Sequence, residues 1–106
     1  MKTFLVIGLG RFGTALAEEL CALGNEVLAV DLSDERVQAV AEKVTYAAAG
    51  DCREAEVLQA LGARNVDCAV VATGSDVGVS ALITLNLKEL GVPRVVSKAH
   101  SAIHRK

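Results

Sequence analysis

The chain has 106 residues, a formal net charge of −2 and 52% hydrophobic residues, and only three residues are aromatic. This length fits one domain, and the apolar fraction suits a sheet whose two faces are both buried by aliphatic side chains. The slightly acidic balance argues against nucleic acid as the main ligand, and the three cysteines have no metal-ligand or redox spacing.

Nothing in the sequence has the pattern of a membrane span or a secretory leader. No apolar run approaches the roughly 20 residues that cross a bilayer, and Met1 directly precedes the first apolar stretch. An odd number of cysteines without a leader fits a reducing cytoplasm, where Cys21 and Cys68 would be small core residues. We therefore expect a soluble, cytoplasmic chain that reaches a membrane only through a partner.

Short apolar runs alternate along the chain with segments of helical apolar spacing. The runs predict strands over residues 3–8, 26–31, 44–49, 68–72 and 94–98. The periodic segments predict helices over residues 11–23, 34–42, 53–61 and 77–90, and a last helix that begins near residue 100. Ser33 is placed to cap the second helix, and a glycine follows the first, third and fourth helices as a stop signal.

This alternation predicts a Rossmann-like α/β fold of three layers. Right-handed crossovers between the strands give a parallel sheet of order 3-2-1-4-5 with helices on both faces. Because such a sheet usually has a sixth strand, and the chain ends inside a helical pattern, we expect the natural protein to continue beyond residue 106. Ligands of these sheets bind beyond the carboxyl ends of the strands, where the first and fourth strands diverge.

The first predicted strand runs into a glycine-rich turn, Gly8-Leu9-Gly10-Arg11-Phe12-Gly13. In a dinucleotide-binding turn the first glycine permits the sharp bend, the second lets the backbone approach a pyrophosphate, and the third lets the helix pack on the strand. The start of that helix offers free N–H groups and a positive dipole end to phosphates. The alternative is a tight α/β turn that binds nothing.

An acid closes the second predicted strand, since Asp31 lies 18 residues after Gly13. This is near the spacing of about 20 residues expected for the acid that accepts hydrogen bonds from a ribose. A carboxylate there repels a 2′-phosphate, so the sequence favours NAD over NADP. The remaining strand ends add further residues to the same edge: Leu32, Gly50-Asp51-Cys52, Thr73-Gly74 and Lys98.

Several of these features together resemble one family. They are the arginine inside the glycine turn, the pair Gly50-Asp51, the run Leu61-Gly62-Ala63-Arg64-Asn65-Val66-Asp67, the triplet Ala72-Thr73-Gly74, and Ser97-Lys98-Ala99 followed by His104. The chain is similar over essentially its whole length to the RCK/KTN (TrkA-N) domain, a cytosolic regulator of potassium conductance. The similarity is greatest to the Trk/Ktr-type subunits of bacterial potassium uptake systems. Residues 1–106 would form the nucleotide-binding N-terminal domain without the family's C-terminal lobe.

The resemblance implies a function for the chain and roles for its matching residues. Such domains bind NAD(H), ATP or ADP and assemble as dimers that build rings beneath a membrane-embedded potassium channel subunit. The bound nucleotide changes the ring and so opens or closes the pore. By resemblance, Arg11 and Lys98 would reach phosphates, Asp31 would hold the ribose, and Asp51 and Cys52 would flank the adenine. The candidate binding residues are Gly8, Gly10, Arg11, Phe12, Gly13, Asp31, Leu32, Asp51, Cys52, Thr73, Gly74 and Lys98.

Some of these residues also have a purely structural interpretation. Arg11 can be a solvated surface arginine, Asp51 can cap the third helix, and Lys98 can be an end-of-strand lysine that extends to solvent. The run Asp34-Glu35-Arg36 is expected on a solvated helix face.

No catalytic or metal-binding residues are predicted. The sequence has no nucleophile with a partnered base, and His100 and His104, although four apart, lack an evident third metal ligand. The whole length is used by the nucleotide fold, so nothing is left to build a substrate pocket, and we expect a regulatory module rather than an enzyme. The alternative is the cofactor-binding half of an NAD-dependent dehydrogenase or reductase. A redox-sensing transcription factor would need a helix-turn-helix or basic region, and none is visible.

Overall fold

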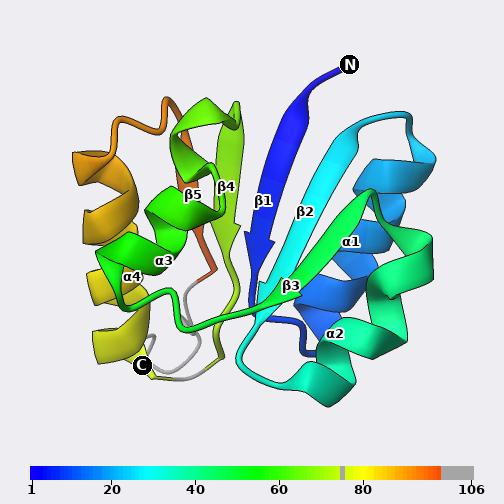
Figure 1. The fold of residues 1–106 in the computed structure, drawn as a ribbon, viewed down its shortest axis with the longest axis horizontal. Coiled ribbons are helices and arrows are strands. Elements are labelled where there is room, and N and C mark those ends of the chain that lie inside the picture. The colour runs from blue at the N-terminus through cyan, green and yellow to red at the C-terminus, as the bar shows by residue number, and fades with distance from the viewer. Residues whose placement is uncertain (75, 99–106) are drawn as a thin grey trace, which may run out of the picture.

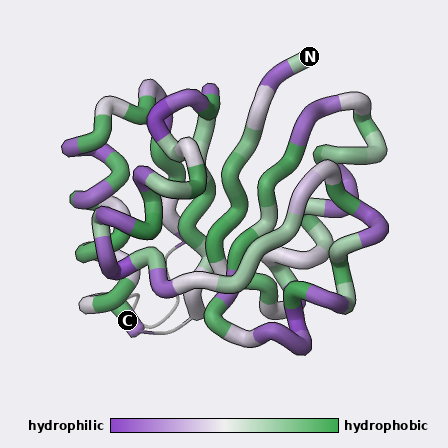
Figure 2. Tube along the Cα trace, in the orientation of Figure 1, coloured by the Kyte–Doolittle hydropathy of each residue, from purple (hydrophilic) through white to green (hydrophobic). Residues whose placement is uncertain are grey.

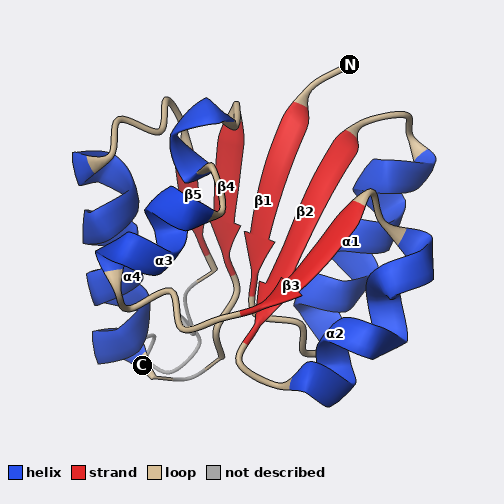
Figure 3. Ribbon diagram, in the orientation of Figure 1, coloured by secondary structure: helices blue, strands red, loops and turns tan. Residues whose placement is uncertain are grey.

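The computed structural model describes residues 1–74 and 76–98. Within them, five strands form one parallel sheet of order β3-β2-β1-β4-β5, which confirms the predicted order. Figure 3 shows this sheet as the middle layer between two layers of helices. The strands are β1 (Thr3–Ile7), β2 (Glu26–Asp31), β3 (Tyr46–Ala49), β4 (Cys68–Val71) and β5 (Val95–Ser97).

Two helices cover each face of the sheet. Helices α1 and α2 lie on one face and α3 and α4 on the other, at the right and left of Figure 1. Their bounds agree with the predictions to within two residues at each end, and two 3₁₀ turns follow α2 and α3. The predicted last helix lies outside the described residues. The elements are α1 (Arg11–Ala22), α2 (Asp34–Val40), η1 (Ala41–Lys43), α3 (Ala55–Ala60), η2 (Ala63–Asn65) and α4 (Val77–Glu89).

The core divides into two clusters because neighbouring residues of a strand point to opposite faces. Leu5 and Ile7 of β1 pack toward α3 and α4, whereas Val6 between them packs toward α1 and α2. Figure 2 shows the strands as largely apolar and the hydrophilic residues on the outer turns of the helices. Burial of each such aliphatic side chain contributes about 1.5–3 kcal/mol, so both helical layers are held mainly by the sheet.

The predicted local signals at the helix ends are present. The Ser33 hydroxyl accepts a hydrogen bond from the Arg36 amide at 3.3 Å, as expected of an N-cap. Helix α1 ends at Ala22, and Gly24 follows its C-cap residue Leu23. Gly24 has a φ of +97°, which suits glycine, and its amide donates to the Cys21 carbonyl at 3.0 Å. Cys68 is buried as predicted, but Cys21 is only partly buried.

Backbone hydrogen bonds continue the sheet beyond its last paired residues. The Gly8 amide donates to the Val30 carbonyl at 2.8 Å, and the Ala72 amide donates to the Ile7 carbonyl at 2.7 Å. The Gly50 amide likewise donates to the Asp31 carbonyl at 3.0 Å. The loops after β1, β2, β3 and β4 therefore leave the sheet side by side at its carboxyl edge, which places the predicted site residues near one another.

Candidate functional site

A cavity of about 360 Å³ opens at the carboxyl edge of the sheet, and we call it the edge cavity. It is walled by the loops that follow β1 to β4, by α2 and by the first turns of α4. The predicted residues that line it are Gly8, Gly10, Asp31, Leu32, Asp51, Cys52, Thr73 and Gly74. Arg11, Phe12, Gly13 and Lys98 lie outside its lining, around the start of α1.

The three glycines of the turn after β1 differ in how much room a side chain would have at each position. A Cβ at Gly8 would overlap the Ala72 carbonyl, and Gly8 also has a φ of +99°. A Cβ at Gly13 would overlap the Gly8 carbonyl. A Cβ at Gly10 would meet only a guanidinium nitrogen of Arg36, at 4.0 Å. The fold thus requires the first and third glycines, whereas the second faces open space in the edge cavity.

Asp31 is anchored at the end of β2 by the backbone around it. One carboxylate oxygen, Oδ2, accepts a hydrogen bond from the Leu9 amide at 2.7 Å, and the other, Oδ1, accepts one from the Ser33 amide at 2.8 Å. The side chain is 11% exposed. Each carboxylate oxygen can accept a further bond, so Asp31 can hold the glycine turn in place and still face a ligand.

Arg36 has a position that the sequence did not predict in full. Asp34 and Glu35 are exposed as expected, but Arg36 lines the edge cavity although its side chain is 59% exposed. Its Nη1 lies 3.8 Å from Oδ2 of Asp31 and beside Gly10. Its position in the first turn of α2 directs the side chain back across the glycine turn. Sequence spacing alone marked this residue as part of a charged helix face.

Asp51 does not cap α3, contrary to the structural interpretation that the sequence offered for it. Helix α3 begins at Ala55, and its N-cap residue Glu54 makes no side-chain capping bond. Asp51 instead pairs with Arg53 through two parallel hydrogen bonds, 2.9 Å from Nε to Oδ1 and 2.7 Å from Nη2 to Oδ2. Hydrogen bonding to Arg53 lowers the pKa of Asp51 from 3.8 to about 2. The cavity wall therefore carries a carboxylate that is ionised at neutral pH and has its own counter-ion, Arg53, which no sequence pattern indicated.

Cys52 lies next to this ion pair and lines the edge cavity with 3% of its surface exposed. Burial, assisted by the charges of Asp51 and Asp31, raises the pKa of the Cys52 thiol from 9.0 to about 12. The thiol is therefore neutral at pH 7, and it acts as a small apolar wall rather than as a nucleophile.

The far wall of the edge cavity is fixed by contacts with α4. The hydroxyls of Thr73 and Ser80 are 2.7 Å apart, which ties the loop after β4 to this helix. The Asp76 carboxylate caps α4 by accepting a hydrogen bond from the Val79 amide at 3.0 Å. Val79 and Ile83 of α4 then add apolar surface to the lining.

Lys98 and Phe12 form a separate contact beside the glycine turn. The Lys98 Nζ lies 5.2 Å from the centroid of the Phe12 ring, within the range of a cation–π interaction. Phe12 and Arg11 occupy the exposed first turn of α1. This contact places a positive charge next to the helix start, although outside the cavity lining.

In the part of the chain that the structure describes, no group of three side chains is arranged to hold a metal ion. His100 and His104 lie outside that part. No helix within residues 1–74 and 76–98 combines the length and apolar character that a membrane crossing requires.

The family model of the TrkA-N domain matches residues 4–106. This chain belongs to the TrkA-N domain family. Its relatives include Ktr system potassium uptake protein A of Bacillus subtilis, which is 45% identical over 105 residues. That match covers 99% of this chain and 47% of the relative, so the TrkA-N chain spans about half the length of the uptake protein.

Solved structures agree with the fold. The NAD(P)-binding domain of an exopolyphosphatase-related protein from Archaeoglobus fulgidus superposes with a TM-score of 0.79 and 27% identity, covering 92% of this chain and 72% of that one. The Kef CTD of Shewanella denitrificans, in its AMP-bound form, gives a TM-score of 0.61 and 22% identity, covering 92% of this chain and 57% of that one. The second likeness shows the fold alone.

Proposed function

We propose that this TrkA-N domain is the nucleotide-binding part of a regulatory subunit for potassium uptake. It binds an adenine nucleotide, NAD(H) or ATP/ADP, in the edge cavity. The bound nucleotide biases how copies of the full-length protein are arranged, and that arrangement opens or closes a membrane potassium transporter. The relatives are named for potassium uptake rather than for a reaction, which supports a regulatory role over an enzymatic one.

The observation that carries nucleotide binding is the open position of Gly10. The fold needs no glycine there for packing, yet a Cβ would extend into the edge cavity beside the start of α1. A phosphate that contacts this backbone also meets the N-terminus of α1, a 12-residue helix with no acidic residue in its first turn. The turn therefore suits an anion that approaches the main chain closely.

We assign the remaining walls of the edge cavity to different parts of the proposed nucleotide. Asp31 accepts hydrogen bonds from the ribose hydroxyls with the acceptor capacity that its backbone bonds leave free. The purine lies in the part of the cavity between Cys52 and the apolar side chains of Val79 and Ile83. Asp51 is ionised and can accept from an exocyclic amino group. Arg11 and Lys98, outside the lining, serve the terminal phosphates.

Gating follows from unequal binding to two arrangements of the assembled subunits. A tenfold difference in affinity supplies about 1.4 kcal/mol per site, so several sites acting together are needed to switch a pore firmly. We propose a homo-oligomeric ring against the membrane partner for this reason.

Titration calorimetry of the domain with ATP, ADP, NAD and NADH tests the binding step. We expect measurable heat with at least one of them. No heat with any of the four would remove the proposed function. For gating, potassium flux through the full-length protein with its membrane partner in vesicles should change when the bound nucleotide is exchanged.

An activity assay of the full-length protein tests the dehydrogenase alternative. Full-length protein is incubated with NADH and a panel of carbonyl substrates, and absorbance at the NADH band is followed. We expect no turnover. Steady oxidation that depends on protein concentration would favour a reductase.

A further inference from the structure

Arg36 is a charged cavity residue that the proposed ligand contacts leave unused. We propose that Arg36 makes the ribose corner of the edge cavity accept a 2′-phosphate, so that the domain binds 2′-phosphorylated adenine nucleotides such as NADP. The inference rests on the proposed function, because it concerns one end of the same nucleotide. It opposes the simple expectation that an acid at Asp31 excludes NADP.

The geometry of the corner places a cation beside the acid. The Nη1 atom of Arg36 is 3.8 Å from Oδ2 of Asp31 and 4.0 Å from the position of a Cβ at Gly10. A ribose whose hydroxyls bond to Asp31 has its 2′ position at this carboxylate. A substituent on that hydroxyl therefore meets the guanidinium as well as the acid. In dinucleotide folds a nearby arginine is the group that accommodates a 2′-phosphate.

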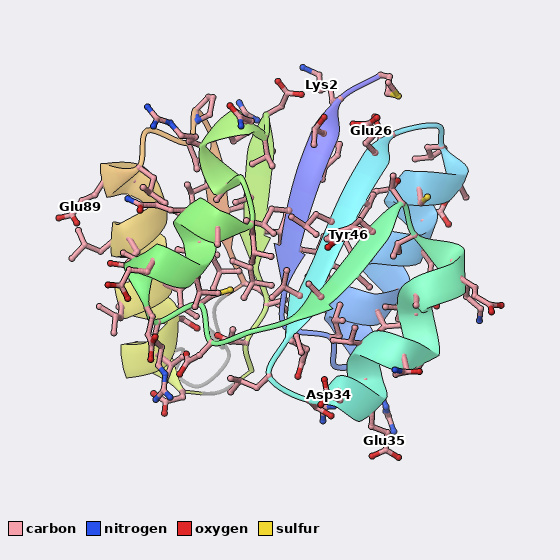
Figure 4. The ribbon with its side chains drawn as sticks, viewed as in Figure 1. Lys2, Glu26, Asp34, Glu35, Tyr46 and Glu89 are labelled. Atoms are coloured by element: carbon pink, nitrogen blue, oxygen red, sulfur yellow. The ribbon has the colours of Figure 1, made fainter. Side chains whose placement is uncertain are left out.

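The charge of Asp31 is already partly compensated. Both of its oxygens accept backbone hydrogen bonds, from Leu9 and Ser33, and these N–H dipoles lower the negative potential that a phosphate would meet. The neighbouring acids Asp34 and Glu35 stay outside the cavity lining. Figure 4 shows both at the outer end of α2, at the bottom of the view. Arg36 is therefore the charge of α2 that faces the corner.

Arg36 is also free to move to a phosphate. At 3.8 Å its contact with Asp31 is longer than a hydrogen bond, and its side chain is 59% exposed. A guanidinium presents several N–H donors in one plane, so it can form two parallel bonds to phosphate oxygens. Arg53, by contrast, is not free to move in this way, because two short hydrogen bonds hold its guanidinium to Asp51.

Two ligand pairs that differ only in the 2′-phosphate test the inference: NAD with NADP, and AMP with adenosine 2′,5′-bisphosphate. Calorimetry at low ionic strength gives the affinity ratio within each pair for the unchanged domain and for Arg36→Ala. We expect the unchanged domain to bind both members within about tenfold of each other. Loss of charge-assisted hydrogen bonds in Arg36→Ala should weaken the 2′-phosphorylated member by about tenfold or more, with less than about threefold change in the other.

Arg64→Ala is the matched control, because it removes the same charge from exposed η2, which precedes β4 at the opposite edge of the sheet. Its affinity ratio should equal that of the unchanged domain. An equal loss for both members in Arg36→Ala overturns the inference. So does failure of NADP and the bisphosphate to bind while NAD or ATP binds, an outcome that leaves the proposed function standing. Failure of every nucleotide overturns both.

Discussion

At the scale of single residues, Gly10 differs from the other two glycines of the turn because we expect it to matter for binding more than for folding. A side chain at Gly8 would overlap the Ala72 carbonyl after β4, and one at Gly13 would overlap the Gly8 carbonyl. Gly10 has no such close contact. A substitution at Gly10 therefore acts on whatever approaches from the cavity, and one at Gly13 acts on the fold.

The first prediction compares these two positions. Gly10→Ala should cost no more than about 1 kcal/mol of stability, because Gly10 is the N-cap of α1 and alanine is a poorer cap. It should weaken nucleotide binding about tenfold or more, because the methyl occupies the approach path. Gly13→Ala should lose more than about 2 kcal/mol of stability, because its Cβ has no room against the Gly8 carbonyl. Urea denaturation and calorimetry measure the two quantities. Full nucleotide affinity in Gly10→Ala would contradict the proposed phosphate position.

The second prediction concerns the pH dependence of the Asp51–Arg53 pair. The folded-state pKa of Asp51, about 2, lies below its ordinary value of 3.8, so the stabilisation is present above pH 3.8 and is lost as the pH falls toward 2. Arg53→Gln removes the cause of the shift, so its urea midpoint should fall less between about pH 5 and pH 2.5 than that of the unchanged domain. Arg64→Gln serves as the control and should keep the full decrease.

At the scale of elements, α4 links the edge cavity to the core. It contributes Val79 and Ile83 to the cavity, and its Ser80 holds Thr73 in the loop after β4. One turn later, the buried Thr84 hydroxyl has no hydrogen-bond partner among the described residues. Removing the hydroxyl of Ser80 should therefore lower the stability of the domain, whereas removing that of Thr84 should raise it.

The third prediction uses this pair. Thr84→Val keeps the shape and removes the unsatisfied hydroxyl, so the domain should gain about 1 kcal/mol of stability. Ser80→Ala leaves the Thr73 hydroxyl without its partner and should cost about 1–2 kcal/mol. Thermal denaturation of both variants in the same buffer decides the matter. A loss of stability in Thr84→Val would show that its hydroxyl is satisfied in solution.

At the scale of the whole molecule, ligand binding and folding are coupled. The edge cavity is built by the loops that follow four strands and by two helices, so it exists only in the folded chain. A ligand that binds only the folded state stabilises it by mass action.

The fourth prediction is the size of that effect. A nucleotide at 100 times its dissociation constant should stabilise the domain by about 2.7 kcal/mol. For a domain of this size the unfolding temperature should rise by about 10 °C or more. Scanning calorimetry with and without nucleotide measures the shift, and Gly10→Ala should reduce it strongly. Equal shifts in both proteins would mean that the nucleotide binds away from the glycine turn.

The sequence by itself determined the order of the strands, the glycine turn and the position of Asp31. These follow from local patterns, because apolar periodicity, glycine conformations and chain order constrain the backbone directly. It did not determine that Arg36 enters the cavity, that Arg53 engages Asp51 instead of Asp51 capping α3, or that Lys98 lies over Phe12. Only the tertiary structure decided these contacts. Arg36 and Lys98 reach partners on other elements, and Arg53 lies two residues from Asp51 in a loop whose conformation sequence patterns do not specify.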